Sequence, residues 1–405
     1  MRQYAAGAPA VPHALKGSVI DTPGLATRVH LNNAGAALMP AVVSETITAH
    51  IARESTTGGY EAADAAASEL AATYEAIAEL TGAAPRNIAI TSSATHAFAQ
   101  ALSAFEFERG DVILTSSNDY ISNQLMFLSL ARRRGVRIVR APEASAGGVD
   151  VDAFAALLRR ERPRVATLTW VPTNSGLIQP AAEIGAACRD AGVPFILDAC
   201  QAVGQLEIDL RALPCDYLAA TARKFLRGPR GIGFLVVSDE ALARGDHPRL
   251  VDMRGARWTD ADTFDLVDDA RRFEEWELPY ALVLGLGAAA RYALEVGVAA
   301  GARRAHELAA TARAMLTQLP GVRSLDHGAR LSAIATFELA GRDAHAIMLA
   351  LRSEGINTSA QSRGDAVIDL DRKQVESQLR VSPHYYNDEG ELETLRDALA
   401  GLLGA

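Results

Sequence analysis

The sequence predicts an α/β protein that has a large domain with a mostly parallel sheet and a smaller α+β domain at its C-terminal end. Three observations lead to this prediction. Between Pro85 and Val237, short apolar runs alternate with segments of helical period, as strands joined by crossover helices do. The runs are apolar at nearly every position, which suits strands covered by helices on both faces. After Val237 the alternation ends, and a charged stretch leads into a long Ala-rich segment.

Seven strands are expected in the large domain, at residues 87–91, 111–114, 137–139, 165–170, 194–197, 217–220 and 232–237. The helical segments lie at 94–107, 123–134, 152–160 and 181–191, and residues 53–74 also have helical character. The C-terminal part predicts one long helix over 280–316, a strand at 331–337, a helix at 343–354, a strand at 379–382 and a terminal helix at 388–403. We therefore divide the chain into an N-terminal segment (1–30), a large domain (31–265) and a small domain (266–405).

The composition excludes several classes of protein. Of the 405 residues, 49% are hydrophobic and 22% are charged, which is typical of a folded domain protein. The net charge of -9, without a basic stripe, argues against a nucleic-acid partner. The longest apolar run, 280–290, is too short to cross a bilayer, and the three cysteines have no metal-binding or disulfide spacing. We expect a cytoplasmic protein with no membrane partner and no metal site.

Two predicted strands end in residues that suit catalysis. Asp198 follows the apolar run 194–197, and Lys224 follows the run 217–220. In an open parallel sheet, ligands bind at the carboxyl ends of the strands. Taken alone, Asp198 is equally consistent with a helix cap, and a single lysine is most often a solvated surface charge. Lys224, however, is one of only three lysines and leads into a Gly-rich turn before another buried strand, an unusual place for a surface lysine.

A third strand end supplies a candidate anion site. Residues 92–96, Ser-Ser-Ala-Thr-His, follow the strand 87–91 and open a helix. Free backbone N–H groups and the helix dipole favour an anion there, although the same residues are also good helix caps. A lysine that forms an imine, an aspartate that keeps a ring nitrogen protonated and a phosphate site together describe a binding site for pyridoxal 5'-phosphate (PLP).

The order of these parts resembles the class V aminotransferase family of fold-type I PLP enzymes, which includes cysteine desulfurases, isopenicillin N epimerase-like proteins and hercynylcysteine sulfoxide lyases. The resemblance runs from His-Leu-Asn-Asn-Ala at 30–34 to Leu-Arg-Val-Ser-Pro-His-Tyr-Tyr-Asn at 379–387. It implies that Lys224 holds the cofactor as an imine, that Asp198 pairs with the pyridine nitrogen and that Gln201 bonds the phenolic oxygen. The other implied cofactor contacts are Ala94, Thr95, Tyr120, Thr173, Asn174, Thr221 and Arg223. Arg223 replaces the usual histidine, and either Thr173 or Asn174 approaches the ring substituent.

The resemblance also implies how substrate and subunits are arranged. Arg380 corresponds to the arginine that grips the substrate carboxylate, and Asn33 lies in a segment that lines the substrate side. A homodimer is implied, with residues 276–277 at a phosphate contact between subunits and residues 58–60 facing the active site.

One departure from the family bears on the reaction. Cysteine desulfurases carry a mobile nucleophilic cysteine in the C-terminal domain, whereas residues 355–363 contain none and all three cysteines precede residue 216. We therefore expect a carbon–sulfur lyase that works by β-elimination on a small amino acid, with Lys224 as the base. An aminotransferase and an epimerase are alternatives; an epimerase needs a second acid, for which His96, His384, Tyr385 and Tyr120 are candidates. A scaffold that binds PLP without turnover is disfavoured, because Lys224 and Asp198 are both present.

Overall fold

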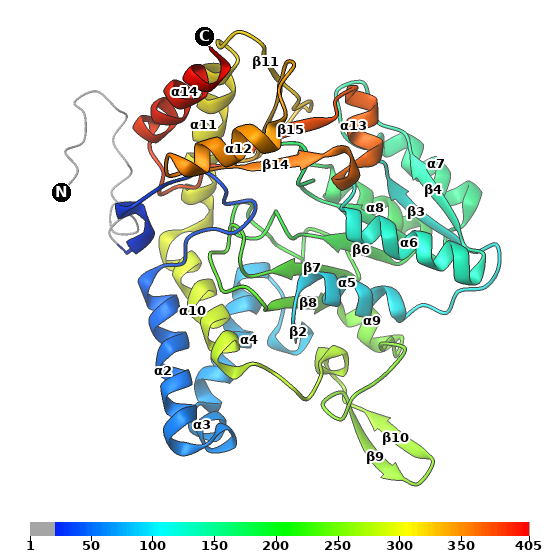
Figure 1. Ribbon diagram of the computed structural model, residues 1–405. Coiled ribbons are helices and arrows are strands. Elements are labelled where there is room, and N and C mark those ends of the chain that lie inside the picture. The colour runs from blue at the N-terminus through cyan, green and yellow to red at the C-terminus, as the bar shows by residue number, and fades with distance from the viewer. Residues whose placement is uncertain (1–20, 405) are drawn as a thin grey trace.

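A seven-stranded sheet forms the centre of the larger part of the molecule in the computed structural model, which describes residues 21–404 (Figure 1). The strand order is β2-β8-β7-β6-β5-β3-β4. Strands β3 to β7 pair parallel to their neighbours, and β8 pairs antiparallel with both β2 and β7. The strands are Ile88–Thr91 (β2), Val112–Ser116 (β3), Arg137–Ala141 (β4), Val165–Thr169 (β5), Phe195–Asp198 (β6), Tyr217–Thr221 (β7) and Gly233–Val237 (β8). The predicted mostly parallel sheet is confirmed, with strand ends displaced by one or two residues.

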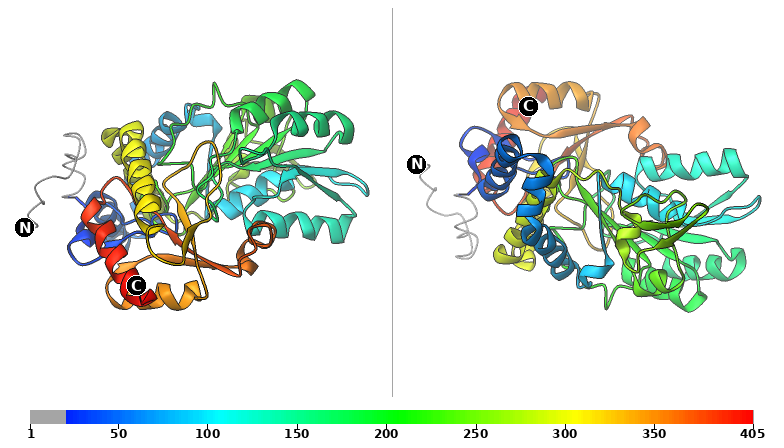
Figure 2. Two further views of the ribbon diagram at one scale, coloured as in Figure 1. Left: turned by 90° about the horizontal axis from the view of Figure 1, so that it is seen from above. Right: turned by 90° about the horizontal axis from the view of Figure 1, so that it is seen from below.

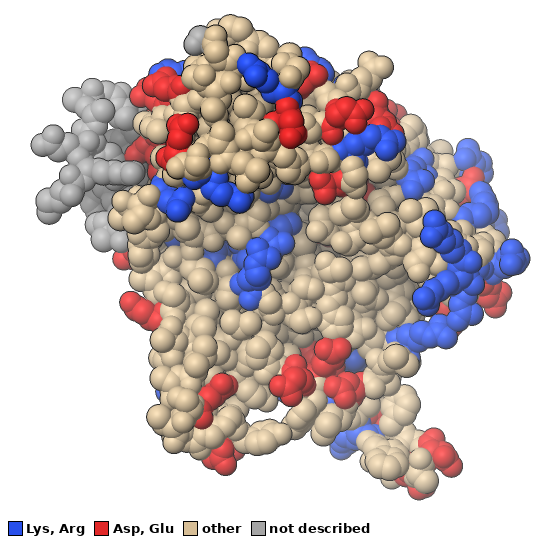
Figure 3. All heavy atoms as spheres, in the orientation of Figure 1, with Lys and Arg blue, Asp and Glu red and all other residues tan. Residues whose placement is uncertain are grey.

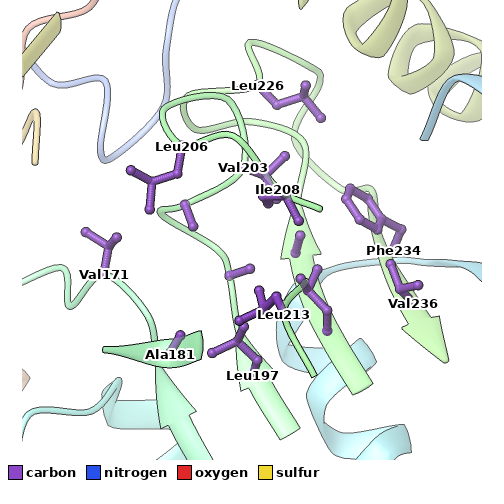
Figure 4. Packing of buried hydrophobic residues seen from close by; sticks show 14 of the residues in the cluster. Val171, Ala181, Leu197, Val203, Leu206, Ile208, Leu213, Leu226, Phe234 and Val236 are labelled. Carbon is purple, nitrogen blue, oxygen red and sulfur yellow. The ribbon is translucent and has the colours of Figure 1, made fainter. Parts of the chain in front are cut away.

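Helices cover both faces of this sheet because the pleat sends alternate strand residues to opposite sides. On one face, Leu197, Phe234 and Val236 belong to a core cluster that α4, α7, α8 and α10 complete (Figure 4). On the other face, Ile196 and Tyr217 pack with residues of α5 and α6. The helices of this part are Ala41–Thr57 (α2), Gly59–Ala65 (α3), Ala67–Thr81 (α4), Ala94–Ser103 (α5), Ile121–Arg134 (α6), Val151–Glu161 (α7), Ala181–Ala191 (α8), Asp239–Ala243 (α9) and Tyr280–Val296 (α10).

A second, antiparallel sheet lies toward the C-terminal end, with strand order β11-β12-β15-β14. Its strands are Val322–Ser324 (β11), Ala335–Leu339 (β12), Ser359–Ser362 (β14) and Ser377–Val381 (β15), and its helices are Val298–Leu316 (α11), Ala344–Ser353 (α12), Val367–Lys373 (α13) and Glu389–Leu403 (α14). A short strand near the N-terminus, Val29–His30 (β1), pairs with Ile356–Asn357 (β13). Both views in Figure 2 show this N-terminal region, in blue, beside the orange and red C-terminal part. The pairing therefore carries the residues that follow β1 to the boundary between the two sheets.

Two sequence predictions need correction. The single long helix expected over 280–316 is two helices, α10 and α11, which are bent by 82° relative to each other. Gly297 lies between them with φ +85°, a conformation that breaks a right-handed helix and that glycine adopts without steric cost. The charged stretch after Val237 contains an unexpected hairpin, Ala256–Asp260 (β9) and Thr263–Leu266 (β10), which projects from the body of the molecule in Figure 1.

The described residues 21–404 contain no single helix that is both long and apolar enough to cross a membrane. The bent pair of α10 and α11 meets that test by length and composition only. The division of the chain at residues 265 and 266 stays a prediction, and residues 1–20 of the predicted N-terminal segment lie outside the described residues. Buried residues of α10 join the core cluster of the large sheet, whereas Leu308 and Leu316 of α11 join that of the small sheet.

Candidate active site

Asp198 and Lys224 meet at one edge of the large sheet. Strands β6 and β7 run parallel, with Asp198 paired in register with Ala219, so both strands deliver their following residues to the same edge. The two side chains are almost completely buried, with 4% of Asp198 and 6% of Lys224 exposed. The two neighbouring apolar strands β6 and β7 therefore bring a carboxylate and an amine together in a region with little access to water.

The orientation of Asp198 is set by two donors. Asn123 Nδ2 donates to Asp198 Oδ2 at 3.0 Å, and the backbone N–H of Cys200 donates to Asp198 Oδ1 at 2.9 Å. The same Asn123 amide donates to Asp119 Oδ1 at 3.1 Å, so it bridges two buried carboxylates. The sequence analysis did not select Asn123 or Asp119. The sequence did contain an indication of their role, since both lie where the chain leaves the end of strand β3 and enters α6.

Lys224 lies beneath the ring of Tyr120, with Nζ 5.7 Å from the ring centroid. Burial lowers the pKa of Lys224 most strongly; nearby Cys200 and Asp198 raise it, and the positive charges of Arg223 and Arg380 lower it further. The net shift is downward, because a buried ammonium loses its hydration. An amine whose pKa falls toward neutrality is better suited to accept a proton than a surface lysine.

The predicted phosphate site is formed by the N-terminus of α5 and the start of β8. Ser93 caps the helix, its Oγ accepting from the backbone N–H of His96 at 3.1 Å. Gly233 permits the close approach of the strand, because a Cβ there would lie 2.9 Å from the backbone nitrogen of Ala94. Ala94 is buried and Thr95 is exposed at the first turn. The free N–H groups of this turn suit an anion.

Thr221 pairs in register with Gly233 beside this turn, and the side chains of Thr221 and Arg223 both bond to carbonyls of the chain. Thr221 Oγ1 donates to the carbonyl of Ile232 at 3.4 Å, and the Arg223 guanidinium donates to the carbonyl of Gly35. Burial, followed by the charge of nearby Arg230, lowers the pKa of Arg223. The roles of both residues toward a phosphate stay predictions.

Four segments that are distant in the sequence meet at the Arg380 side of the site. Arg380 of β15 donates through Nη1 to Thr173 Oγ1 at 2.5 Å and through Nη2 to Asn32 Oδ1 at 3.1 Å. Gln201 Nε2 donates to Thr173 Oγ1 at 3.0 Å and to the carbonyl of Ala34 at 2.9 Å. Thr173 thus contacts the residues expected at the cofactor and at the substrate carboxylate.

Two predicted residues have side chains that bond elsewhere in the chain. The Asn174 amide donates to Asn118 Oδ1 at 2.9 Å and to Asp369 Oδ2 at 2.7 Å, so between the two alternatives Thr173 is the residue placed with Gln201 and Arg380. Asn33 is fully buried, and its amide donates to the carbonyl of Ser382 at 2.8 Å. Its neighbour Asn32, which the sequence analysis did not select, is the residue that contacts Arg380. The substrate role assigned to Asn33 stays a prediction.

Two buried polar atoms at this site lack a hydrogen-bond partner among residues 21–404. Gln201 Oε1 and Arg380 Nε are both buried without a hydrogen bond. Burial, and then the charge of Arg223, lowers the pKa of Arg380 to about 10. Unpaired buried polar groups are rare in folded proteins because each costs about 1–3 kcal/mol. Together with the anion site at α5, these groups fit a polar, phosphorylated ligand that also brings a carboxylate.

The comparison with known protein families agrees with this arrangement. The family model described as aminotransferase class-V matches residues 29–395. The chain belongs to this family. This class V chain is 26% identical over 392 residues to a probable cysteine desulfurase of Methanothermobacter thermautotrophicus, covering 95% of this chain and 97% of the relative. It is 27% identical over 379 residues to a probable hercynylcysteine sulfoxide lyase of Mycobacterium tuberculosis, covering 93% and 91%.

Solved structures show the same fold. The cysteine desulfurase of Thermococcus onnurineus superposes with a TM-score of 0.87 at 22% identity, covering 98% of this chain and 99% of that one. The cystine C–S lyase C-DES, in complex with its reaction product cysteine persulfide, superposes with a TM-score of 0.83 at 25% identity, covering 94% and 99%. A variant of C-DES holds glycine covalently linked to its PLP. This class V chain is therefore a PLP-dependent lyase or transferase of fold type I, and its cofactor is PLP.

Proposed function

We propose that this enzyme is a carbon–sulfur lyase that cleaves an S-substituted cysteine by β-elimination without forming a protein persulfide. The observation that carries the proposal is the absence of a cysteine where desulfurases carry their nucleophile. Residues 355–363 form β13, β14 and the start of a short turn, and they contain no cysteine. Cys200 is the cysteine nearest to Asp198 and Lys224, and burial raises its pKa, so its thiol is a poor nucleophile. The likeness to C-DES supports the same reaction type.

Each residue of the site has a separate role in the elimination. Bound PLP supplies an electron sink for the bond that breaks at Cα. Lys224, as the free amine, accepts the α-proton, and Arg380 pairs with the substrate carboxylate. Asn32 and Thr173 hold the Arg380 guanidinium in place, which fixes the direction in which the carboxylate binds. Asp198, held by Asn123, is the carboxyl group at the position assigned to the ring nitrogen.

The balanced reaction consumes the S-substituted cysteine and one water and releases a thiol, pyruvate and ammonium. The thiol takes a proton as the C–S bond breaks, and water hydrolyses the released 2-aminoacrylate. No oxidant or reductant is needed, because the electron pair of the broken Cα–H bond forms the new double bond while the C–S pair leaves with sulfur.

Three of the four candidates for the second acid that an epimerase needs are engaged elsewhere, and the fourth, Tyr120, lies over Lys224. His384 is buried and its ring nitrogen bonds the carbonyl of Phe225 at 3.0 Å; burial lowers its pKa to about 3, so the ring stays neutral. His96 pairs with Glu275 at 3.4 Å. Tyr385 OH accepts from the buried Arg227 guanidinium. These contacts favour a lyase over an epimerase.

The test is to incubate the purified holoenzyme with an S-substituted cysteine and to measure pyruvate, ammonia and keto acids separately. The lyase proposal expects pyruvate and ammonia in equal amounts. A keto acid that retains the side chain would contradict it and favour an aminotransferase. Recovery of the D-amino acid would favour an epimerase.

We further propose that the enzyme acts as a homodimer that pairs through its exposed aromatic side chains. Tyr60, Trp258 and Trp276 are 71%, 81% and 42% exposed, and Trp258 lies on the projecting β9–β10 hairpin. Figure 3 shows a broad face with few charged side chains over α2 and α10, below a group of Lys and Arg side chains at the boundary between the two sheets. Large exposed apolar groups of this kind mark interfaces. Light scattering combined with active-site titration tests the proposal, and a fully active monomer would refute it.

A further inference from the structure

A cavity of about 270 Å³ lies beside the candidate active site, between α6 and the segment from Gly364 to Asp369. One water needs only about 10–15 Å³ by the same measure, so the cavity is large enough for an organic group. In the chain, its lining residues Asp119 and Asn174 directly adjoin Tyr120 and Thr173. A further lining residue, Asp365, is close enough to Arg380 to raise its pKa, which partly offsets the effect of burial. Two lining residues are therefore chain neighbours of site residues, and a third is a carboxylate whose charge acts on Arg380.

The walls of the cavity are apolar and open. Leu125 and Leu128 of α6 and Val367 of α13 line it and are 58%, 42% and 44% exposed. Ile121 and Ile368 complete the apolar lining. Large aliphatic side chains left this exposed around a hollow favour an apolar ligand, because covering them removes their surface from water.

One donor in the cavity lacks an acceptor. Arg140 Nη2 donates to Gln124 Oε1 at 2.6 Å, whereas Nη1 has no hydrogen-bond partner among the described residues. The acidic residues of the lining are better satisfied. Asp369 pairs with Lys373 Nζ at 2.6 Å, and Asp119 accepts from Thr115 Oγ1 at 2.9 Å and from other donors. The unmet need of the cavity is thus a hydrogen-bond acceptor.

The charge of the lining selects the kind of acceptor. Arg140 is the one basic residue among the described lining residues, against the three acidic residues Asp119, Asp365 and Asp369. An anionic group at Arg140 would also face these carboxylates, whereas a neutral carbonyl oxygen satisfies the donor without that repulsion.

We infer that this cavity is the subsite for the sulfur substituent of the substrate, and that it takes an apolar stem ending in an uncharged carbonyl group. The inference rests on the proposed function and deepens it, since it names the class of S-substituted cysteine that the enzyme prefers. The stem contacts Leu125, Leu128 and Val367, and the carbonyl oxygen accepts from Arg140. After elimination, the departing thiol leaves through the open side of the cavity.

The experiment measures binding of four amino acids to the holoenzyme: S-methylcysteine, S-butylcysteine and the amide-terminated and carboxylate-terminated analogues of the butyl compound. The half-saturating concentration is read from the change in cofactor absorbance, and pyruvate is measured in parallel. Affinity is expected to rise at least about tenfold from methyl to butyl, since burial of even one of the three added methylenes in an apolar pocket is worth about tenfold or more. It is expected to rise again with the amide and to fall with the carboxylate. Equal affinity for all four would overturn the inference.

Matched variants assign the effect to the cavity. Leu125→Glu is expected to remove the preference for butyl over methyl, while Leu349→Glu, at a similarly exposed position on α12 (56%), is expected to keep it. Arg140→Met is expected to remove only the gain from the amide, with the exposed Arg137→Met of the same strand as its control. Loss of the dimer in Leu125→Glu with the preference intact would make the cavity an interface between copies and overturn the inference. Absorbance reports binding whether or not cleavage follows, so a preference without pyruvate would refute the lyase proposal and keep the subsite.

Discussion

Arg380 and Arg227 are both nearly buried, with 5% and 2% exposed, yet their guanidinium groups have different surroundings. Arg227, three residues after Lys224, donates to the carbonyl of Leu38 at 2.9 Å, to Tyr385 OH at 2.6 Å and to Thr22 Oγ1 at 2.7 Å. The rings of Tyr292, Tyr385 and Tyr386 lie within 5.4 Å of its central carbon. Arg380 donates to Thr173 and Asn32 through its two terminal nitrogens only, and its buried Nε has no partner among the described residues.

The difference separates a structural arginine from one that waits for a ligand. Both side chains lost their hydration on burial, and a buried charge is tolerated only where hydrogen bonds replace the lost water. In the Arg227 cluster, each of the three guanidinium nitrogens has an acceptor, and the cluster ties the Lys224 segment to the N-terminal and C-terminal regions. At Arg380 the replacement is incomplete, and a substrate carboxylate would complete it.

The largest effect is expected at Lys224, which lies three residues before Arg227 and whose pKa is lowered by burial and also by the charge of Arg380. Lys224→Ala should lower turnover at least about 100-fold, because general-base catalysis contributes about 10²–10⁴. The thermal midpoint should change little, since Nζ makes no hydrogen bond to the described residues and lies 5.7 Å from the centroid of the Tyr120 ring. Borohydride reduction and peptide mapping of the native enzyme provide the check: the pyridoxyl group should be found on Lys224, and finding it on Lys16 or Lys373 would refute the assignment.

Arg227→Lys is the next largest effect and should act on stability. The ammonium reaches fewer acceptors than the guanidinium does, so the free energy of unfolding should fall by about 3 kcal/mol. Denaturant unfolding of the variant measures this loss. Half-saturation by S-methylcysteine should stay near the native value in the fraction that remains folded; an unchanged unfolding midpoint would mean that the cluster is not structural.

Arg380→Lys should show the opposite pattern. The loss of a paired, charge-assisted contact to the substrate carboxylate costs about 1.5–3 kcal/mol, which lowers kcat/KM by about 10- to 100-fold. Stability should change less than in Arg227→Lys, because Arg380 already lacks one of its bonds. The measurement compares kcat/KM and the free energy of unfolding between the two variants. Equal losses of both quantities in the two variants would contradict a structural role for Arg227 and a substrate-binding role for Arg380.

The pH dependence should identify the charges that tune Lys224. The base must be unprotonated, so kcat should rise with pH through the lowered pKa of Lys224 and level off above it. Removing a nearby positive charge in Arg223→Gln should raise that pKa and move the rising limb to higher pH. A pH–rate profile of both enzymes tests the shift, and movement to lower pH would show that Arg223 acts differently on the amine.

Cys200→Ser is expected to have the smallest effect. The thiol is buried and its pKa is raised, and the contact that matters is the backbone N–H of Cys200, which a serine retains at Asp198 Oδ1. Turnover with an S-substituted cysteine should stay within about twofold, well inside the small changes usual for conservative substitutions. Loss of activity, or a persulfide trapped on Cys200, would replace the lyase proposal with a desulfurase mechanism.

The sequence by itself determined the parts of the molecule whose signals are local. Alternating apolar runs and helical periods predicted the seven strands, because a strand buried on both faces needs apolar residues throughout. The positions of Asp198 and Lys224 could be placed at one sheet edge for the same reason, since both follow buried strands. The residues at the start of α5 were equally readable from their capping pattern.

Only the tertiary structure decided the contacts between distant segments. Arg380 meets Asn32 across 348 residues and Thr173 across 207, and no local pattern distinguishes Asn32 from Asn33 or Thr173 from Asn174. The cavity between α6 and α13 likewise exists only because segments that are far apart in the sequence lie against each other in the fold. Periodicity reports which face of an element is buried, but which atoms meet across the interface depends on packing, and that is decided when the whole chain folds.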